Sequence, residues 1–189
     1  MKRRIKDLSP ESLVVLPVMV AWALLLGGCA THNSPLSATE SGSGVRDERP
    51  VIGLQHDGPI RVVFQISADE WKDGVGKGLL QLRNLHQAYT DVGVEGDRLQ
   101  IHAVFHGTAA EHLLTDSAWN RWHEESDGNP NAELVGELAR RGVAVELCDT
   151  RRVANGWSKA DIHPDVVLVR DAYERISDLQ FQGFAYIRF

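Results

Sequence analysis

Residues 60–66 read Ile60-Arg61-Val62-Val63-Phe64-Gln65-Ile66, and this stretch decides the fold. Its apolar, β-branched centre is typical of a strand that is buried on both faces of a sheet. The next residues, 67–70, match a capping box, with Ser67 as the N-cap and Glu70 three positions on. Apolar residues then repeat at helical spacing from Val75 to Tyr89. The sequence therefore predicts a strand followed directly by a helix.

The rest of the chain repeats this alternation of strand and helix. Four further strands are predicted at residues 99–105, 143–147, 166–169 and 184–187. Helices are predicted at residues 109–114, 132–141, 151–153 and 172–179, with Asn131 as the N-cap of the second of these. Strands separated by helices require crossover connections, which give a mainly parallel sheet with helices on both faces. We therefore predict an α/β fold, a three-layer α/β/α sandwich.

The first 58 residues predict an export signal and a linker. Basic residues at 2, 3, 4 and 6 precede an apolar stretch, 13–26, that is too short to span a bilayer comfortably. The stretch ends in Leu26-Gly27-Gly28-Cys29, which resembles a bacterial lipoprotein signal. An uncleaved anchor helix and an ordinary secretory signal are the alternatives. We expect a signal peptide at 1–28, a flexible tether at 29–58 that is rich in Ser, Gly and Pro, and one domain at 59–189.

The lipoprotein resemblance implies a location in the cell envelope. Lipid on Cys29 would attach the protein to a membrane, with its domain facing the periplasm. Ala30, in place of an aspartate, resembles proteins that are sent on to the outer membrane. The predicted partner of the N-terminus is therefore a membrane.

The charge of the chain argues against nucleic acid as a partner. The formal net charge is -6, and removal of residues 1–28, with four basic and two acidic side chains, makes it -8. Binding to nucleic acid requires clustered Lys and Arg that neutralise phosphates, and the sequence has no basic stripe with interleaved aromatic residues.

Two candidate functional residues follow predicted strands. His106 comes after the second strand and Cys148 after the third. In parallel sheets, ligands and chemistry collect at the carboxyl ends of strands. A thiol beside a neutral imidazole can give up its proton and become a nucleophilic thiolate. The alternative is that Cys148 is a small buried residue, because free cysteine is among the most buried residue types.

Several short motifs together resemble the DsrE/DsrF-like family, and the resemblance covers residues 59–189. They are Phe105-His106-Gly107, Leu113-Leu114-Thr115-Asp116, Asn129-Pro130-Asn131, Gly142 to Cys148, Ile162 to Val169 and Gly183-Phe184-Ala185-Tyr186-Ile187. The family includes sulfur-relay subunits of sulfur oxidation and of tRNA thiolation. The resemblance implies a five-stranded sheet of order 4-3-2-1-5, which would place His106 next to Cys148. It also implies that Cys148 accepts and hands on a persulfide sulfur, and that the protein forms a homo-oligomer.

The chain departs from the family pattern after the cysteine. Asp149-Thr150 follows Cys148, where relatives of this exported type usually carry Gly-Gln or Gly-Asn. A carboxylate beside a thiolate should raise the pKa of the thiol, and Arg151 and Arg152 offset this effect.

Two functions are compatible with these features. The first is a sulfur carrier in which Cys148 forms the persulfide, His106 is the base and Arg151 or Arg152 stabilises the anion, with a sulfur donor or acceptor protein as partner. The second is a noncatalytic binding or accessory module in which Cys148 is structural. A nucleotide-binding enzyme is disfavoured, because Gly74 to Gly78 fits no phosphate-binding pattern and is expected inside the first helix.

Histidine and tryptophan residues suggest two further features. His102, His106, His112 and His123 make a metal site conceivable, but unclustered histidines usually face solvent or other side chains, so we predict neither a metal nor a cofactor. Trp119 and Trp122 are expected to flank a loop, where they either cover the core or line a binding surface.

Overall fold

The computed structural model describes residues 49–188. The predicted signal peptide, Cys29 and residues 29–48 of the predicted tether lie outside the described residues. Within the described part, residues 49–59 contain no helix or strand and are mostly exposed. In residues 49–188 there is no helix that combines the length and apolar character needed to cross a membrane.

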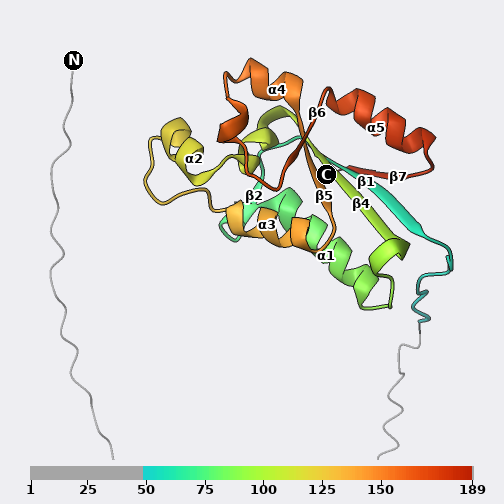
Figure 1. Cartoon of the computed structure of the whole chain (residues 1–189). Coiled ribbons are helices and arrows are strands. Elements are labelled where there is room, and N and C mark those ends of the chain that lie inside the picture. Colours follow the sequence, from blue (N-terminus) through green and yellow to red (C-terminus); the bar gives the residue numbers. More distant parts are fainter. Residues whose placement is uncertain (1–48, 189) are drawn as a thin grey trace, which may run out of the picture. The chain divides into compact units, whose positions relative to one another are not determined.

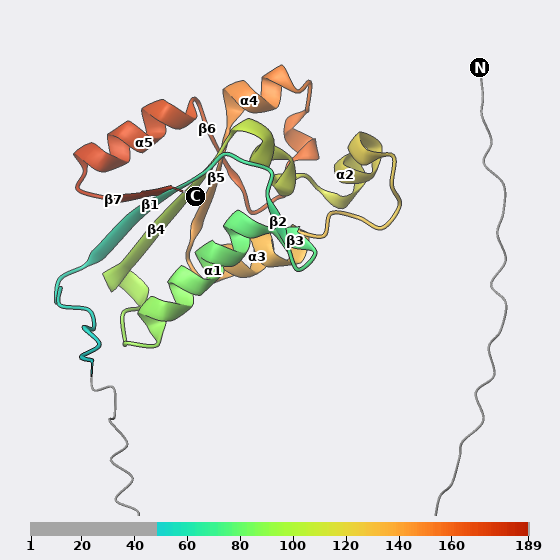
Figure 2. The same ribbon diagram turned by 180° about the vertical axis from the view of Figure 1, so that it is seen from behind.

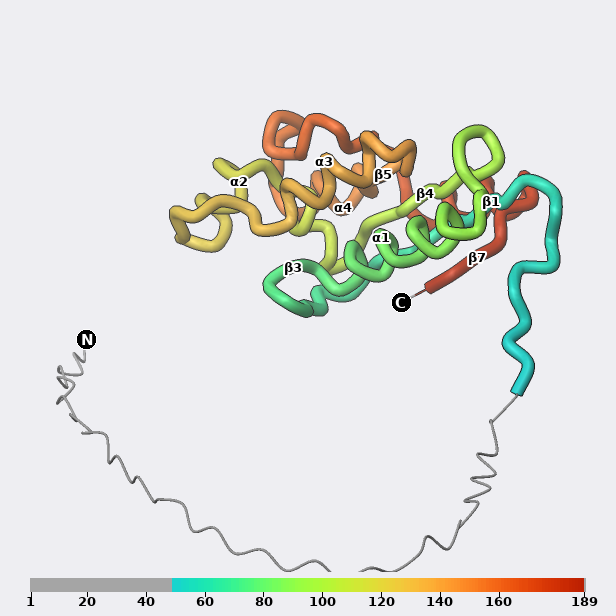
Figure 3. Tube along the Cα trace, turned by 90° about the horizontal axis from the view of Figure 1, so that it is seen from below, coloured from blue at the N-terminus to red at the C-terminus, as the bar shows by residue number. Residues whose placement is uncertain are grey.

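The described part is built on a five-stranded sheet in which every strand pair is parallel. In chain order its strands are β1 (Ile60–Ile66), β4 (Leu99–Phe105), β5 (Ala144–Cys148), β6 (Val167–Val169) and β7 (Ala185–Arg188). Across the sheet the order is β6-β5-β4-β1-β7 (Figure 1). Counted along the chain, this is the predicted order 4-3-2-1-5, which confirms the predicted fold class. Figure 3 shows β7, the last strand, beside β1, the first.

Helices cover both faces of the sheet. On one side lie α1 (Lys77–Thr90) and α3 (Ala132–Arg140), and on the other lies α5 (Ala172–Phe181) (Figure 1). The short helix α4 (Asp149–Ala154) follows β5 directly, and α2 (Asp116–His123) lies beyond the end of the sheet. Three 3₁₀ helices, η1 (Gly96–Arg98), η2 (Gly107–Leu113) and η3 (Lys159–Asp161), occupy connections.

Strand alternation places the buried apolar residues on two faces of the sheet, in two main clusters and a small third one of Ile60, Val62 and Val94. Phe64, Phe105 and Leu147 point to the α1/α3 face, where they join a large apolar cluster. Their neighbours in sequence point to the α5 face, where Val63, Val104 and a few residues of α5 form a much smaller cluster. The larger cluster is the main core of the fold.

The start of the first helix differs from the prediction. Ser67 and Glu70 do not cap a helix, because α1 begins only at Lys77. The carbonyl oxygen of Ser67 instead accepts the N–H groups of Thr108 and Ala109, which fixes residue 67 at the end of the sheet. A two-stranded antiparallel hairpin fills the interval, with strands β2 (Trp71–Lys72) and β3 (Val75–Gly76), as Figure 2 shows from behind.

Gly74 and Gly76 belong to this hairpin and not to a helix, whereas Gly78 lies in a helix as the sequence had suggested for all three. Asp73 and Gly74 both have positive φ angles and form its turn. Gly76 packs so closely on the ring of His112 that a Cβ at this position would lie 2.5 Å from Nδ1. Gly78 lies in α1 and allows close approach to Ile66.

The region of the two tryptophans also differs from the prediction. Trp119 and Trp122 lie on helix α2 and do not flank a loop, because Thr115 starts a helix there by accepting the N–H of Ala118 on its hydroxyl. Trp119 is 4 % exposed and belongs to the main core, whereas Trp122 is exposed and packs edge-on against Trp157. The interpretation that these rings cover the core is therefore confirmed for Trp119.

Candidate functional site

The strand register places the two sequence candidates side by side. Phe105 of β4 pairs with Leu147 of β5, so His106 and Cys148 follow at the carboxyl ends of neighbouring parallel strands. Because side chains alternate along a strand, both residues belong to the α5 face. The predicted proximity of His106 and Cys148 thus follows from the sheet itself.

Cys148 is a free and buried cysteine. Its residue exposure is 5 %, and it joins the small apolar cluster that includes Val104, Ala172 and Ile176. It also occupies the N-cap position of α4. Among the described residues, none forms a hydrogen bond with the thiol. In this conformation Cys148 is therefore packed as an apolar side chain.

The charged residues after Cys148 are engaged with one another and with the backbone. Arg152 donates through Nε to the Asp149 carboxylate at 2.5 Å and also donates to the carbonyl oxygen of Trp157. The hydrogen bond from Arg152 lowers the pKa of Asp149. Arg151 donates through Nε to the carbonyl oxygen of Gly107 at 2.9 Å, which ties α4 to the loop after β4. Arg152 thus neutralises Asp149, but no hydrogen bond from either arginine reaches Cys148 within the part of the chain that is described.

His106 is held at the end of a hydrogen-bonded relay. The hydroxyl of Tyr186 donates to Oε1 of Gln65, so the amide nitrogen of Gln65 faces Nε2 of His106, at 2.6 Å. Gln65 therefore donates to Nε2, and the ring proton belongs on Nδ1. The ring also lies edge-on to Tyr173, with centroids 5.1 Å apart. His106 is a neutral imidazole whose acceptor nitrogen is already occupied.

Burial and nearby cations both disfavour a charged His106. Desolvation is the main cause that lowers its pKa below the ordinary value of 6.5, and Arg188 and Arg151 lower it further, while Asp171 acts in the opposite sense. A neutral ring can accept a proton, as the predicted role of base requires. The proton of Cys148 can reach Nε2 only if Gln65 first gives up its hydrogen bond.

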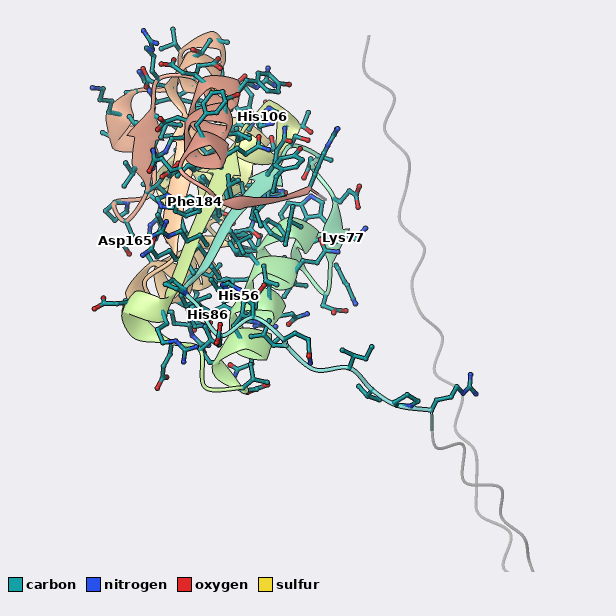
Figure 4. The ribbon with its side chains drawn as sticks, turned by 90° about the vertical axis from the view of Figure 1, so that its right-hand side faces the viewer. His56, Lys77, His86, His106, Asp165 and Phe184 are labelled. Atoms are coloured by element: carbon teal, nitrogen blue, oxygen red, sulfur yellow. The ribbon has the colours of Figure 1, made fainter. Side chains whose placement is uncertain are left out.

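A cleft of about 490 Å³ opens beside His106. Figure 4 shows His106 close to α5 and far from His86, which lies toward the opposite end of the sheet. The cleft is lined by Gln65, Ser67, His106, Gly107, Tyr173, Ile176, Ser177, Gln180, Tyr186 and Arg188. Ile176 also belongs to the cluster around Cys148, so the cleft and the thiol share a wall. Apart from His106, none of these residues was predicted to be functional, although Gln65 carries a signal as a polar residue within an otherwise apolar strand.

A second polar cluster lies on the same face of the sheet. The carboxylate of Glu146 is 3 % exposed and accepts two hydrogen bonds from Arg175, at 2.9 and 3.0 Å. It also lies 2.7 Å from Nδ1 of His102, whose ring is edge-on to Phe184. Burial opposes ionisation of Glu146, but the hydrogen bonds from His102 and Arg175 outweigh it and lower its pKa. This cluster anchors α5 to β4 and β5.

The four histidines considered as metal ligands are distributed over different sites. His102 and His106 belong to the two clusters just described, whereas His112 binds Asp69 through Nε2 at 2.8 Å on the other side of the sheet. His123 stacks on Trp119. Residues 49–188 contain no group of three or more His, Cys, Asp or Glu side chains that is arranged to hold a metal ion.

These features define a class: a small α/β sandwich with a free cysteine and a neutral histidine at the carboxyl edge of its parallel sheet. The model of the DsrE/DsrF-like family matches residues 73–189, and the chain belongs to this family. The resemblance found in the sequence is therefore confirmed.

Two solved structures are similar to this chain. One is a protein of unknown function, MTH1491, from Methanobacterium thermoautotrophicum, with 23 % identity, a TM-score of 0.50 and coverage of 69 % of this chain and 99 % of that one. The other is the ychN protein from E. coli, with 15 % identity, a TM-score of 0.48 and the same two coverages. No curated protein matches the chain. At 23 % identity, the likeness to MTH1491 supports the fold alone.

Proposed function

We propose that this protein is an exported, lipid-anchored sulfur carrier in which Cys148 forms a persulfide. The observation that carries this proposal is the position of Cys148 and His106 at the carboxyl ends of adjacent strands, on one face of the sheet. Membership of the DsrE/DsrF-like family, which includes sulfur-relay proteins, supports the same function. The anchor would be lipid attached to Cys29.

The proposed transfer is a thiol exchange without net oxidation. The thiolate of Cys148 attacks the outer sulfur of a donor persulfide, R–S–SH, and a new S–S bond forms while the S–S bond of the donor breaks. The donor leaves with the electron pair as a thiolate. His106 takes the proton of Cys148 and returns it to the departing thiolate. The products are the Cys148 persulfide and R–SH, and attack by an acceptor thiol on the outer sulfur restores Cys148.

Two local movements are part of this mechanism. Gln65 must release Nε2 of His106, because this nitrogen is the acceptor for the proton. The first turn of α5 must also shift, because Cys148 packs in one cluster with Ala172 and Ile176. A carrier that keeps its sulfur covered between transfers is protected from oxidation, which is a risk for a lone thiol in an oxidising compartment.

The alternative function is a noncatalytic binding or accessory module. The low exposure of Cys148 and the apolar character of its neighbours favour this alternative. In this case the cleft beside His106 would bind a ligand or a partner, and Cys148 would only fill space beneath α5.

Intact mass spectrometry distinguishes the two functions. The full-length chain carrying Cys29→Ser, in which Cys148 is the remaining thiol, is incubated with a persulfide donor. A carrier gains one sulfur atom that dithiothreitol removes. The matched control is Cys148→Ser in the same background, which should gain none. An unmodified Cys148 that is also inert to a small thiol reagent under native conditions would refute the carrier and favour the binding module.

The predicted anchor is tested separately. Cells that express the full-length chain are fed a labelled fatty acid, and the protein is recovered from membranes. We expect label in the wild type and none in Cys29→Ser. Equal labelling of both proteins would contradict the role of Cys29.

A further inference from the structure

The cleft beside His106 differs in charge from the other clefts of the described chain. Among the described residues, its lining includes Arg188 and no carboxylate. Each of four other clefts in residues 49–188 contains at least one Asp or Glu. The protein as a whole is acidic, with a formal net charge of -6. A carboxylate-free cleft with a cation in its wall is therefore a local exception to the charge of the molecule.

Arg188 is the charged group of this cleft, and no carboxylate of residues 49–188 pairs with it. Within the described residues it forms no ion pair, unlike Arg121, Arg152 and Arg175 but like Arg61 and Arg151. It lies on β7 opposite Gln65 of β1, at the same end of the sheet as His106. Its charge is close enough to His106 to disfavour protonation of the ring. Arg188 thus brings a positive charge to the wall of the cleft, and no described carboxylate lines the cleft beside it.

The relay leaves the Nδ1–H donor of His106 without a partner among the described residues, and His106 lines this cleft. Because Gln65 occupies Nε2 of His106, the proton of the neutral ring is on Nδ1. Nδ1 has no hydrogen-bond partner among the described residues. It is also not one of the fully buried polar atoms that lack a partner, so Nδ1 is accessible to solvent. Ser67, Tyr173 and Ser177 add hydroxyl groups to the wall. Donors and a guanidinium, without an opposing carboxylate, are the features of an anion site.

We propose that the cleft formed by Gln65, Ser67, His106, Tyr173, Tyr186 and Arg188 binds a small anion, with Arg188 as its counterion. The volume of the cleft, about 490 Å³, is within the range typical of small-molecule sites. Asp171 is the nearby carboxylate that raises the pKa of His106, and it is not one of the residues that line the cleft. The inference does not depend on sulfur transfer at Cys148, and it holds for either function described above.

A nuclear magnetic resonance titration tests this site. The full-length chain with isotope-labelled histidine is titrated with sodium sulfate, and sodium chloride at equal ionic strength serves as the reference. Sulfate carries no transferable sulfur, so the outcome is independent of the reactivity of Cys148. We expect a saturable shift of the His106 ring signals, and a His106 pKa that rises when sulfate is bound, because an anion favours the protonated ring.

Two charge-matched variants locate the effect. Arg188→Gln should weaken sulfate binding by about tenfold or more, since it removes a charge-assisted interaction. Arg61→Gln removes the same charge from an exposed position toward the other end of β1 and should bind sulfate as the wild type does. A second titration with sodium thiosulfate shows whether the site prefers an anion that carries sulfane sulfur. Absence of a saturable shift, or equal binding by wild type and Arg188→Gln, would overturn the proposal.

Discussion

The two faces of the sheet bury different kinds of side chain. On the α1/α3 face the strands contribute apolar side chains to the main core, from Phe64 and Phe105 to Leu147, and the buried polar residues of that side, such as His86 and His112, lie outside the strands. On the α5 face a narrow apolar strip around Val104 and Cys148 lies between two polar groups, the Gln65–His106 relay and the Glu146–Arg175 cluster. Because its apolar cluster is much larger, we expect the first face to contribute more to stability than the second, where polar groups in defined positions replace part of the apolar surface.

The largest effect is expected from the α1/α3 face. Leu147 is fully buried there, next in sequence to Cys148 on the opposite face. Leu147→Ala should lower the free energy of unfolding by about 3 kcal/mol, because it removes apolar contacts and leaves a cavity. Urea denaturation measures this loss. A loss below about 1 kcal/mol would show that this face is not the main core.

The next effect concerns the buried ion pair of the α5 face. Glu146→Gln leaves Arg175 without its carboxylate and should cost about 2 kcal/mol, less than a fully buried pair would, because Arg175 is partly exposed. A double-mutant cycle with Arg175→Met measures the coupling between the two residues. Additive effects would mean that the pair does not anchor α5.

The pH dependence of stability compares the histidines of the two sides. Burial lowers the pKa of both His106 and His112 below 6.5. The folded state therefore favours neutral rings. The stability that this preference contributes is fully present above pH 6.5 and is lost as the pH falls through the folded pKa. The slope of the free energy of unfolding is at most about 1.4 kcal/mol per pH unit for each group. Glu111, whose pKa is raised by burial and by Asp69, acts in the opposite sense.

Urea denaturation between pH 7 and pH 5 measures this dependence. His112→Gln should have a smaller slope than the wild type. The exposed His56→Gln serves as the control and should keep the slope of the wild type. Equal slopes for His112→Gln and the wild type would refute a role of His112.

The smallest effect is expected at Cys148. Cys148→Ala removes one buried heavy atom from the small cluster of the α5 face and should cost about 1 kcal/mol. If persulfide formation is also lost while the free energy of unfolding changes only by this amount, the role of Cys148 is chemical. A cost equal to that of Leu147→Ala would instead make Cys148 a core residue.

Most of the sheet could be predicted from the sequence because its strands are short apolar runs between clear breaks. Residues 60–66 and 99–105 form strands with the predicted bounds. The hairpin before α1 could not be predicted, since Ser67 to Glu70 carries a good local capping pattern. A tertiary contact overrides that pattern, because the backbone of Ser67 binds the loop after β4.

The candidate site was predictable only in part. Strand ends predicted that His106 and Cys148 lie at one edge of the sheet, and the strand order implied by the family resemblance made them neighbours. The relay from Tyr186 through Gln65, in contrast, joins residues far apart in the chain. His102 and Glu146 carried a usable signal, because polar residues inside buried parallel strands need partners. Their common partner, Arg175, lies on a helix more distant in sequence, so its identity depends on the packing of α5.

The order of strands has a consequence for how the chain folds. The first strand, β1, lies inside the sheet, and one of its two neighbours is the last strand, β7, with Val62 paired to Ala185. Figure 3 shows the two ends of the domain meeting along this edge. Such long-range pairing is slow to form, because almost the whole domain must be closed into one loop first. Until β7 arrives, β1 presents an unpaired edge, so a chain that is still being synthesised stays incompletely folded and open to other binding partners.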